Sequence, residues 1–235
     1  MKNILVIAFF ISISALADQV AIDIGHTPKN FGAVSARGVT EYEFNKRMAF
    51  ELKALLAEND IRSFIINDGG EEINLEARTD LATKNNATLF ISIHHDSAQL
   101  KYFDEWDFRG RNFKYSDEFS GYSIFISLSN VNAKQNILMA ELLGQNLLKS
   151  GLKPTLHHSE PIEGENRELI DSVTGIYRYD ELAVLRRATM PAILLECGVI
   201  VNRNEEKNLN SPTYREKILL AVVNSVLEFN RKANQ

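Results

Sequence analysis

The chain has 235 residues, of which 45% are hydrophobic and 24% are charged, and its formal net charge is −5. Charges of both signs are interspersed, which argues against nucleic acid as a partner and gives no reason to expect attraction to anionic polymers. The hydrophobic fraction is enough for one sizeable core, and no repeat, linker or low-complexity tract divides the sequence. We therefore expect one folded domain.

The first residues have the composition of a secretory signal. Lys2 precedes an unbroken apolar stretch that ends in Ala15-Leu16-Ala17, an A-x-A cleavage pattern. The stretch is short for a membrane span, and no cysteine follows it that could carry a lipid anchor. We predict a signal peptide over residues 1–17, with a retained N-terminal anchor as the alternative. Export to the periplasm is favoured over the cell wall or the medium, and no membrane anchor is expected after cleavage.

The rest of the chain alternates apolar runs with amphipathic segments. Strands are predicted over residues 19–24, 63–66, 88–93, 122–128 and 192–195, and helices over residues 41–58, 74–85, 133–150 and 214–229. This alternation favours an α/β fold, a three-layer sandwich in which a mainly parallel, twisted sheet has helices on both faces. In such folds ligands bind beyond the carboxyl ends of the strands.

Two segments depart from this alternation. Residues 98–121 mix aromatic residues with charges of both signs and have no clear helical or strand period. Their aromatic content argues against disorder, so we expect a packed surface excursion, and a lid or a partner-docking element is the functional alternative. Residues 156–179 are polar and are expected to be rich in loops.

Three residues at the starts and ends of these elements suit a metal. His26 and His94 each follow an apolar, strand-like run, and Glu41 lies in the first turn of the helix predicted over residues 41–58. Glu41 alone could be a favourable charge at a helix N-terminus. Two imidazoles and a carboxylate together are a ligand set for one catalytic Zn²⁺ that keeps a position open for water.

A fourth residue, Glu196, ends the apolar run of residues 192–195. A carboxylate is costly to bury without a task, so Glu196 is a candidate general base. Cys197 is the only cysteine of the chain, and it offers a different chemistry, a thiol nucleophile with a histidine base. Its place directly after the apolar run favours an inert, buried cysteine instead.

These four motifs resemble, in chain order, those of the zinc-dependent N-acetylmuramoyl-L-alanine amidases of the amidase-3 family. The matching residues are His26 in IDIGH, Glu41 in GVTE, His94 in SIHHDSA and Glu196 in PAILLECGVIVN. The resemblance implies a catalytic amidase domain over residues 18–235. It further implies a hydrolase that cuts the amide bond between N-acetylmuramic acid and L-alanine of the peptidoglycan stem peptide, in cell-wall remodelling or degradation, with Glu196 as the catalytic residue.

The chain departs from the family pattern at two positions. The last motif reads Glu-Cys-Gly-Val where Glu-x-Gly-Phe is common, and His95 directly follows His94. His95 could replace His94 as the ligand, orient it, or contact the substrate, and the motif alignment favours His94 as the ligand. Besides His95, the candidate substrate-binding residues are His158 and Arg167, which could face the carboxylates of the stem peptide or simply lie in a solvated loop.

Two other functions stay open at this point. A non-catalytic module of the same fold could bind peptidoglycan or regulate another hydrolase, although a degenerate relative would be expected to lose ligands. A zinc carboxypeptidase acting on the stem peptide would share the ligand chemistry but would cut from a free carboxyl end. A protein activator that opens the site is a further possible partner.

Overall fold

The computed structural model describes residues 19–233, and the signal peptide predicted over residues 1–17 lies outside the described residues. Seven strands form one sheet in the order β2-β1-β3-β9-β6-β8-β7. Their bounds are Gln19–Ile24 for β1, Arg62–Ile66 for β2, Leu89–Asp96 for β3, Ser123–Ile126 for β6, Glu168–Asp171 for β7, Ile176–Arg178 for β8 and Ala192–Val199 for β9.

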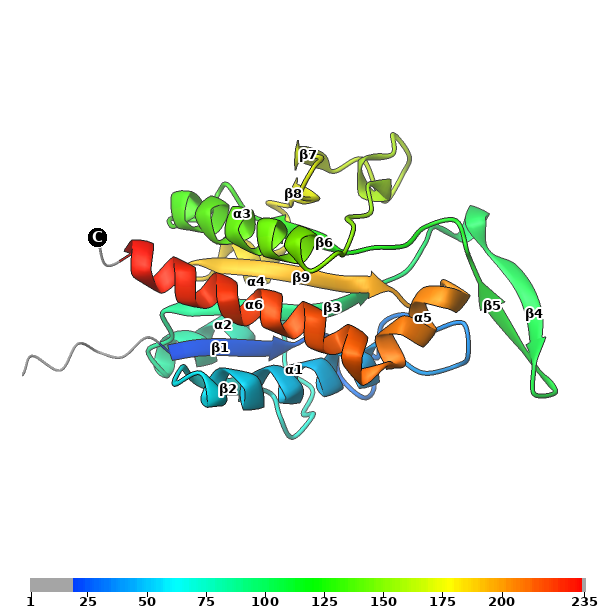
Figure 1. Cartoon of the computed structure of the whole chain (residues 1–235), viewed down its shortest axis with the longest axis horizontal. Coiled ribbons are helices and arrows are strands. Elements are labelled where there is room, and N and C mark those ends of the chain that lie inside the picture. The colour runs from blue at the N-terminus through cyan, green and yellow to red at the C-terminus, as the bar shows by residue number, and fades with distance from the viewer. Residues whose placement is uncertain (1–18, 234–235) are drawn as a thin grey trace, which may run out of the picture.

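The sheet is mainly parallel, as predicted. Strands β2, β1, β3 and β9 run in one direction, and only the β6–β9 and β7–β8 pairs are antiparallel. The central strands β1, β3 and β9 consist largely of buried apolar residues, as expected for strands that are covered on both faces. Their carboxyl ends meet at one edge of the sheet, at the right in Figure 1.

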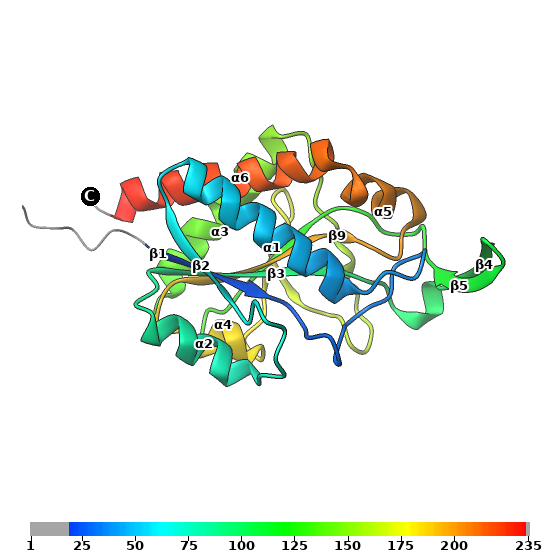
Figure 2. The ribbon, with the colours of Figure 1, turned by 90° about the horizontal axis from the view of Figure 1, so that it is seen from below.

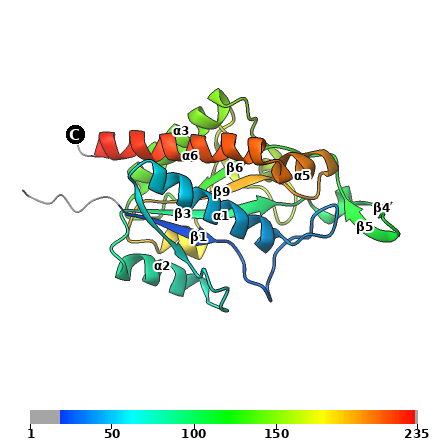
Figure 3. The same cartoon turned by 60° about the horizontal axis from the view of Figure 1, so that its bottom comes forward.

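Helices cover both faces of the sheet (Figures 2 and 3). Their bounds are Glu41–Glu58 for α1, Leu75–Lys84 for α2, Ala133–Lys149 for α3, Ala183–Arg186 for α4, Arg203–Asn210 for α5 and Pro212–Ala233 for α6. Helices α1, α3 and α6 pack on one face, and α2 and α4 pack on the other. Within residues 19–233, no helix has the length and apolar character that crossing a bilayer requires.

Two hydrophobic clusters fill the space between these layers. Alternate residues of β1 contribute to different clusters: Ile22 and Ile24 pack with α1 and α6, while Ala21 packs with α2 and α4. This division follows from the alternation of side chains along a strand. The predicted three-layer α/β sandwich is therefore confirmed.

The prediction that residues 98–121 lack a strand period was wrong. They contain an antiparallel hairpin, β4 (Asp104–Phe108) paired with β5 (Arg111–Tyr115). Its half-buried positions are aromatic and alternate with exposed positions: Trp106, Phe108, Phe113 and Tyr115. The hairpin projects from the body of the molecule beyond the carboxyl ends of β1 and β9 (Figure 1). Residues 156–179, expected to be rich in loops, also contribute the short strands β7 and β8.

Candidate active site and metal centre

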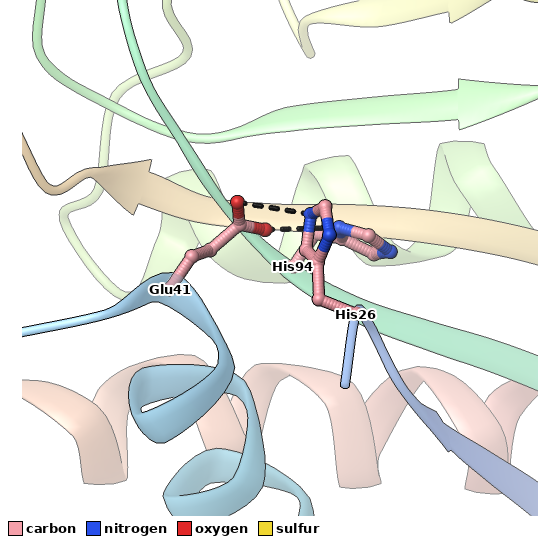
Figure 4. A group of neighbouring side chains, drawn as sticks. All are labelled: His26, Glu41 and His94. Atoms are coloured by element: carbon pink, nitrogen blue, oxygen red, sulfur yellow. Dashed lines mark hydrogen bonds and ion pairs between the residues drawn. The ribbon is translucent and has the colours of Figure 1, made fainter. Parts of the chain in front are cut away.

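His26, Glu41 and His94 converge where β1 and β3 reach the edge of the sheet (Figure 4). His26 Nε2 lies 3.0 Å from Glu41 Oε2, and His94 Nδ1 lies 3.0 Å from Glu41 Oε1. One ligand atom from each of the three residues lies within 4.8 Å of the other two. The ligand atoms of a tetrahedral zinc with bonds of about 2.0 Å are roughly 3.3 Å apart, so the donor set and its spacing fit a metal ion.

An unusual backbone conformation after β1 directs His26 toward this cluster. His26 has φ 67°, a left-handed conformation that is uncommon outside glycine. Arg78 of α2 stabilises it by donating to the carbonyl of His26 at 2.7 Å, while pairing with the buried Asp23 at 2.6 Å. Gly32, at φ 71°, leaves room for the cluster, because a side chain at this position would collide with both His26 and Glu41.

Glu41 is fixed by the start of α1 and by three donors. The Thr40 side chain caps the helix by accepting from the Glu43 amide. The carboxylate of Glu41 accepts from the Ala33 amide at 3.1 Å, from Asn45 Nδ2 at 3.2 Å and from the His95 amide at 3.3 Å. Burial alone would raise the pKa of Glu41, but its bonds to the two histidines hold that pKa well below the usual range. The carboxylate is therefore ionised and suited to a cation.

His94 and His95 point to opposite faces of β3, as neighbours in a strand do. His94 faces the cluster, whereas His95 is 1% exposed and packs against Phe44 of α1. His95 Nδ1 donates to Asn45 Oδ1 at 2.7 Å, because the Asn45 amide nitrogen is used to bond Glu41. Burial lowers the pKa of His95 to about 3, so its ring is neutral. This placement favours His94 as the ligand and argues against contact between His95 and a substrate.

Glu196 lies beside His94 in the paired strands β3 and β9. Its Oε2 is covered and has no hydrogen-bond partner among the described residues. Burial, reinforced by the nearby carboxylates of Asp96 and Glu41, raises the pKa of Glu196 well above its usual value. His94 and Glu196 line one cavity of about 210 Å³, together with His158 and Arg167. A second cavity of about 270 Å³ is lined by His26 and His94, so His94 borders both cavities.

His158 and Arg167 occupy different surroundings within the shared cavity. His158 Nε2 lies 2.7 Å from Asp96 Oδ2, and its Nδ1 lies 2.8 Å from Glu165 Oε2. Burial lowers the pKa of His158, but the two carboxylates outweigh this effect and raise it to about 9. The contacts with Asp96 and Glu165 engage both ring nitrogens of His158. The Arg167 guanidinium stacks 3.9 Å above the ring of Tyr179 and lies at the cavity wall.

Cys197 is 2% exposed. Burial raises the pKa of its thiol well above the usual value, and the nearby carboxylates of Glu196 and Glu41 add to this effect. A nucleophilic cysteine needs a lowered pKa, because the thiolate is the reactive form. The environment of Cys197 therefore favours the inert, buried cysteine.

Sequence reasoning missed two residues that position the cluster, Asn45 and Arg78. Arg78→Met is expected to destabilise the fold by about 3–5 kcal/mol, because it leaves the buried carboxylate of Asp23 without its counter-charge. Urea denaturation would measure this loss. The matched control is Arg187→Met, whose exposed pair with Glu76 at 4.0 Å should change stability by less than about 1 kcal/mol. Equal stability of the two variants would contradict the prediction.

Comparisons with known proteins point to one family. A family model described as N-acetylmuramoyl-L-alanine amidase matches residues 20–228. The probable N-acetylmuramoyl-L-alanine amidase AmiB of Haemophilus influenzae is 30% identical, with 94% of this chain and 54% of that protein covered. The amidase AmiA of Escherichia coli K12 is 25% identical, with 92% and 78% covered. The chain thus spans about half the length of AmiB.

Solved structures share the fold. The N-acetylmuramoyl-L-alanine amidase of Clostridium difficile 630 superposes with a TM-score of 0.71 at 21% identity, covering 92% of this chain and 97% of that one. The catalytic domain of CwlV from Bacillus (Paenibacillus) polymyxa gives 0.67 at 23% identity, covering 91% and 98%. From the match over residues 20–228, the chain belongs to the family of N-acetylmuramoyl-L-alanine amidases, hydrolases that act on peptidoglycan.

Proposed function

We propose that this chain is a zinc-dependent amidase in which His26, Glu41 and His94 hold the metal and Glu196 is the catalytic base. The bond cut joins N-acetylmuramic acid to the L-alanine of the stem peptide, and residues 18–235 form the catalytic domain. The observation that carries this proposal is the position of Glu196. Glu196, whose covered Oε2 has no hydrogen-bond partner among the described residues, lines one cavity together with His94.

The donor set supports zinc as the metal. Two imidazoles and one ionised carboxylate are ligands that zinc prefers, and three protein ligands leave one position free in a catalytic site. When bound, zinc supplies a Lewis acid that polarises the amide carbonyl and makes the attacking water more acidic. The residues around the cluster fix its geometry in advance, because three separate donors hold the Glu41 carboxylate.

Glu196 supplies the proton transfers that amide hydrolysis needs. It takes a proton from the water that attacks the carbonyl carbon and later delivers a proton to the departing nitrogen. A carboxyl group with a raised pKa suits both steps, since it must hold the proton between them.

Arg167 is the candidate for recognising a carboxylate of the stem peptide. Its guanidinium lies at the cavity wall, whereas both nitrogens of His158 are bonded to Asp96 and Glu165. Arg167→Met is expected to raise KM and to lower kcat/KM by roughly 10- to 100-fold, because a hydrogen bond to a charged group is worth about 1.5–3 kcal/mol. Steady-state kinetics on a soluble muropeptide would measure it.

The matched control for Arg167 is Arg178→Met. Arg178 pairs with Glu168 and Asp180 close by but does not line the cavity that contains His94. The Arg178→Met variant should leave KM unchanged. An unchanged KM in Arg167→Met, or the same rise in both variants, would remove Arg167 from substrate recognition.

One experiment tests the proposed function directly. Purified sacculi would be digested with and without a chelator, and the products would be identified by mass. Release of intact stem peptides from N-acetylmuramic acid, abolished by the chelator, is the expected result. Removal of a terminal residue from the stem peptide would identify a carboxypeptidase. If the protein carries its metal and still releases no products, a binding module would be favoured.

Export is part of the proposal and rests on the composition of residues 1–17. The mature chain is proposed to start at Asp18 and to act in the periplasm. Mass measurement of the N-terminus of protein taken from a periplasmic fraction would test both points. A chain that retains Met1 in the membrane fraction would favour an anchor instead.

We further propose that the β4–β5 hairpin controls access of the long glycan-peptide substrate or docks an activator. It contacts the loop between His26 and Glu41, where Trp106 Nε1 donates to the carbonyl of Ala36 at 2.8 Å. None of the described residues lining the two cavities beside His94 belongs to the hairpin. Its effect is therefore expected on large substrates rather than on the chemistry.

Replacing residues 104–115 with a short Gly/Ser linker should leave metal content unchanged and change the rate on sacculi more than the rate on a small muropeptide. A lid or docking element acts on access, which a small substrate does not test. The measurement is the ratio of the two rates in the wild type and in the variant. A ratio that stays the same would contradict the proposal.

A further inference from the structure

A second group of buried side chains converges beside the catalytic cavity. His158 Nε2 and His157 Nε2 lie 2.7 Å and 3.4 Å from the same atom, Asp96 Oδ2. The three ligand atoms lie within 4.8 Å of one another, as in the cluster of His26, Glu41 and His94. We propose that Asp96, His157 and His158 form a second zinc site.

The remaining ring nitrogens are held as they are in metal-binding histidines. His157 Nδ1 bonds Thr155 Oγ1 at 2.8 Å, and His158 Nδ1 bonds Glu165 Oε2 at 2.8 Å. A metal-binding histidine usually donates its second ring N–H to a carboxylate, a backbone carbonyl or water, which fixes the ring and its tautomer. The Glu165 carboxylate is such an acceptor, and the Thr155 hydroxyl oxygen can accept in the same way. Both rings therefore present Nε2 toward Asp96.

His157 shows most directly that a partner is missing. It is 3% exposed, and its Nε2 makes no hydrogen bond within the described part of the chain. A buried polar atom without a partner costs about 1–3 kcal/mol. Its ring is stacked on Phe119 with centroids 4.6 Å apart, and a flip of the ring within this stack would break the bond between Nδ1 and Thr155 Oγ1. The 3.4 Å separation from Asp96 Oδ2 is long for a hydrogen bond but close to the roughly 3.3 Å between two ligands of tetrahedral zinc.

The donor set selects zinc over the common alkaline-earth ions. Two imidazoles and one carboxylate suit zinc, whereas calcium and magnesium take mostly oxygen ligands. Zinc would take the place of the proton between His158 Nε2 and Asp96 Oδ2. These two atoms are 2.7 Å apart, so a small shift of His158 would bring them to the roughly 3.3 Å that separates two ligands of tetrahedral zinc. Charge also favours a cation, because Asp96 and Glu165 both face His158.

The site would fasten the loop that carries Arg167 to the central sheet. Asp96 ends β3, two residues after His94, while His157 and His158 begin the segment that leads to Glu165 and Arg167. A metal between them would link this segment to the strand of the catalytic ligand. The second site is thus proposed to shape the wall of the cavity rather than to bind the reacting amide.

The test is a zinc titration of the full mature protein after chelator treatment, with zinc chloride as the probe and bound zinc measured per chain. Wild type is expected to bind two equivalents. His157→Phe, which keeps the ring stacked on Phe119, and His26→Ala should each bind one, and the double variant none. Glu165→Gln keeps all three ligands and should weaken one equivalent by about 10- to 100-fold in a competition assay with a chelator.

The two zinc proposals fail separately in this experiment. A single equivalent that His26→Ala removes, and that neither His157→Phe nor Glu165→Gln affects, would overturn the second site and leave the catalytic one. A single equivalent that responds to His157→Phe and Glu165→Gln, but not to His26→Ala, would support the second site and contradict the catalytic one. If His157→Phe fails to fold, the affinity of Glu165→Gln still decides the question.

Discussion

Glu196→Gln is expected to lose hydrolysis by roughly 10³-fold or more while keeping its fold and its metal. The substitution preserves the shape of the side chain but removes the group that accepts and returns the proton. Glu196 contacts the cavity that contains His94 but is not one of the three clustered ligands, so metal content should not change. The measurements are the rate of stem-peptide release and the zinc content of the purified variant.

Cys197→Ser is the control for this prediction. It changes the neighbouring residue on β9 and removes the thiol, yet the buried Cys197 faces the hydrophobic cluster rather than the cavity. Near wild-type activity is expected. An inactive Cys197→Ser together with an active Glu196→Gln would establish the thiol mechanism and overturn the assignment of Glu196.

Local sequence patterns were enough to predict the elements that carry the ligands. The ranges 19–24 and 41–58 match β1 and α1 at both ends. The helix range succeeded because Thr40 is a good cap, acidic residues fill the first turn, and apolar residues then recur at helical spacing. These signals lie within one element, so no knowledge of the partner elements was needed.

The same reasoning did not predict where β3 and β9 end. Both strands were predicted to stop before their polar residues, yet β3 continues to Asp96 and β9 to Val199. Backbone pairing does not stop where the side chains become polar, and His94 pairs in register with Glu196. The apolar run marks the buried part of a strand, whereas hydrogen bonding to the neighbouring strand sets its length.

Contacts between distant residues could not be predicted from any local pattern. Arg78 reaches the carbonyl of His26 from α2, and Asn45 links His95 to Glu41 across α1 and β3. The cluster of Asp96, His157 and His158 is similar, because it joins a strand end to a segment expected to be a polar loop. Each of these depends on how the layers pack, which composition and periodicity do not report.

The choice between His94 and His95 shows where the structure adds most, and it leads to the second large effect. His94→Ala is expected to lower zinc affinity at the catalytic site by more than about 100-fold and to abolish hydrolysis, because it removes a ligand rather than a residue that supports one. His95→Asn is the matched variant, since its amide keeps a donor for Asn45 Oδ1 in place of the ring nitrogen. It should retain the zinc, with an affinity weakened by at most about 10- to 100-fold. Zinc competition assays and rates on a muropeptide would be measured for both. Full occupancy and activity in His94→Ala, with loss of both in His95→Asn, would transfer the ligand role to His95 and require β3 to turn its other face toward Glu41.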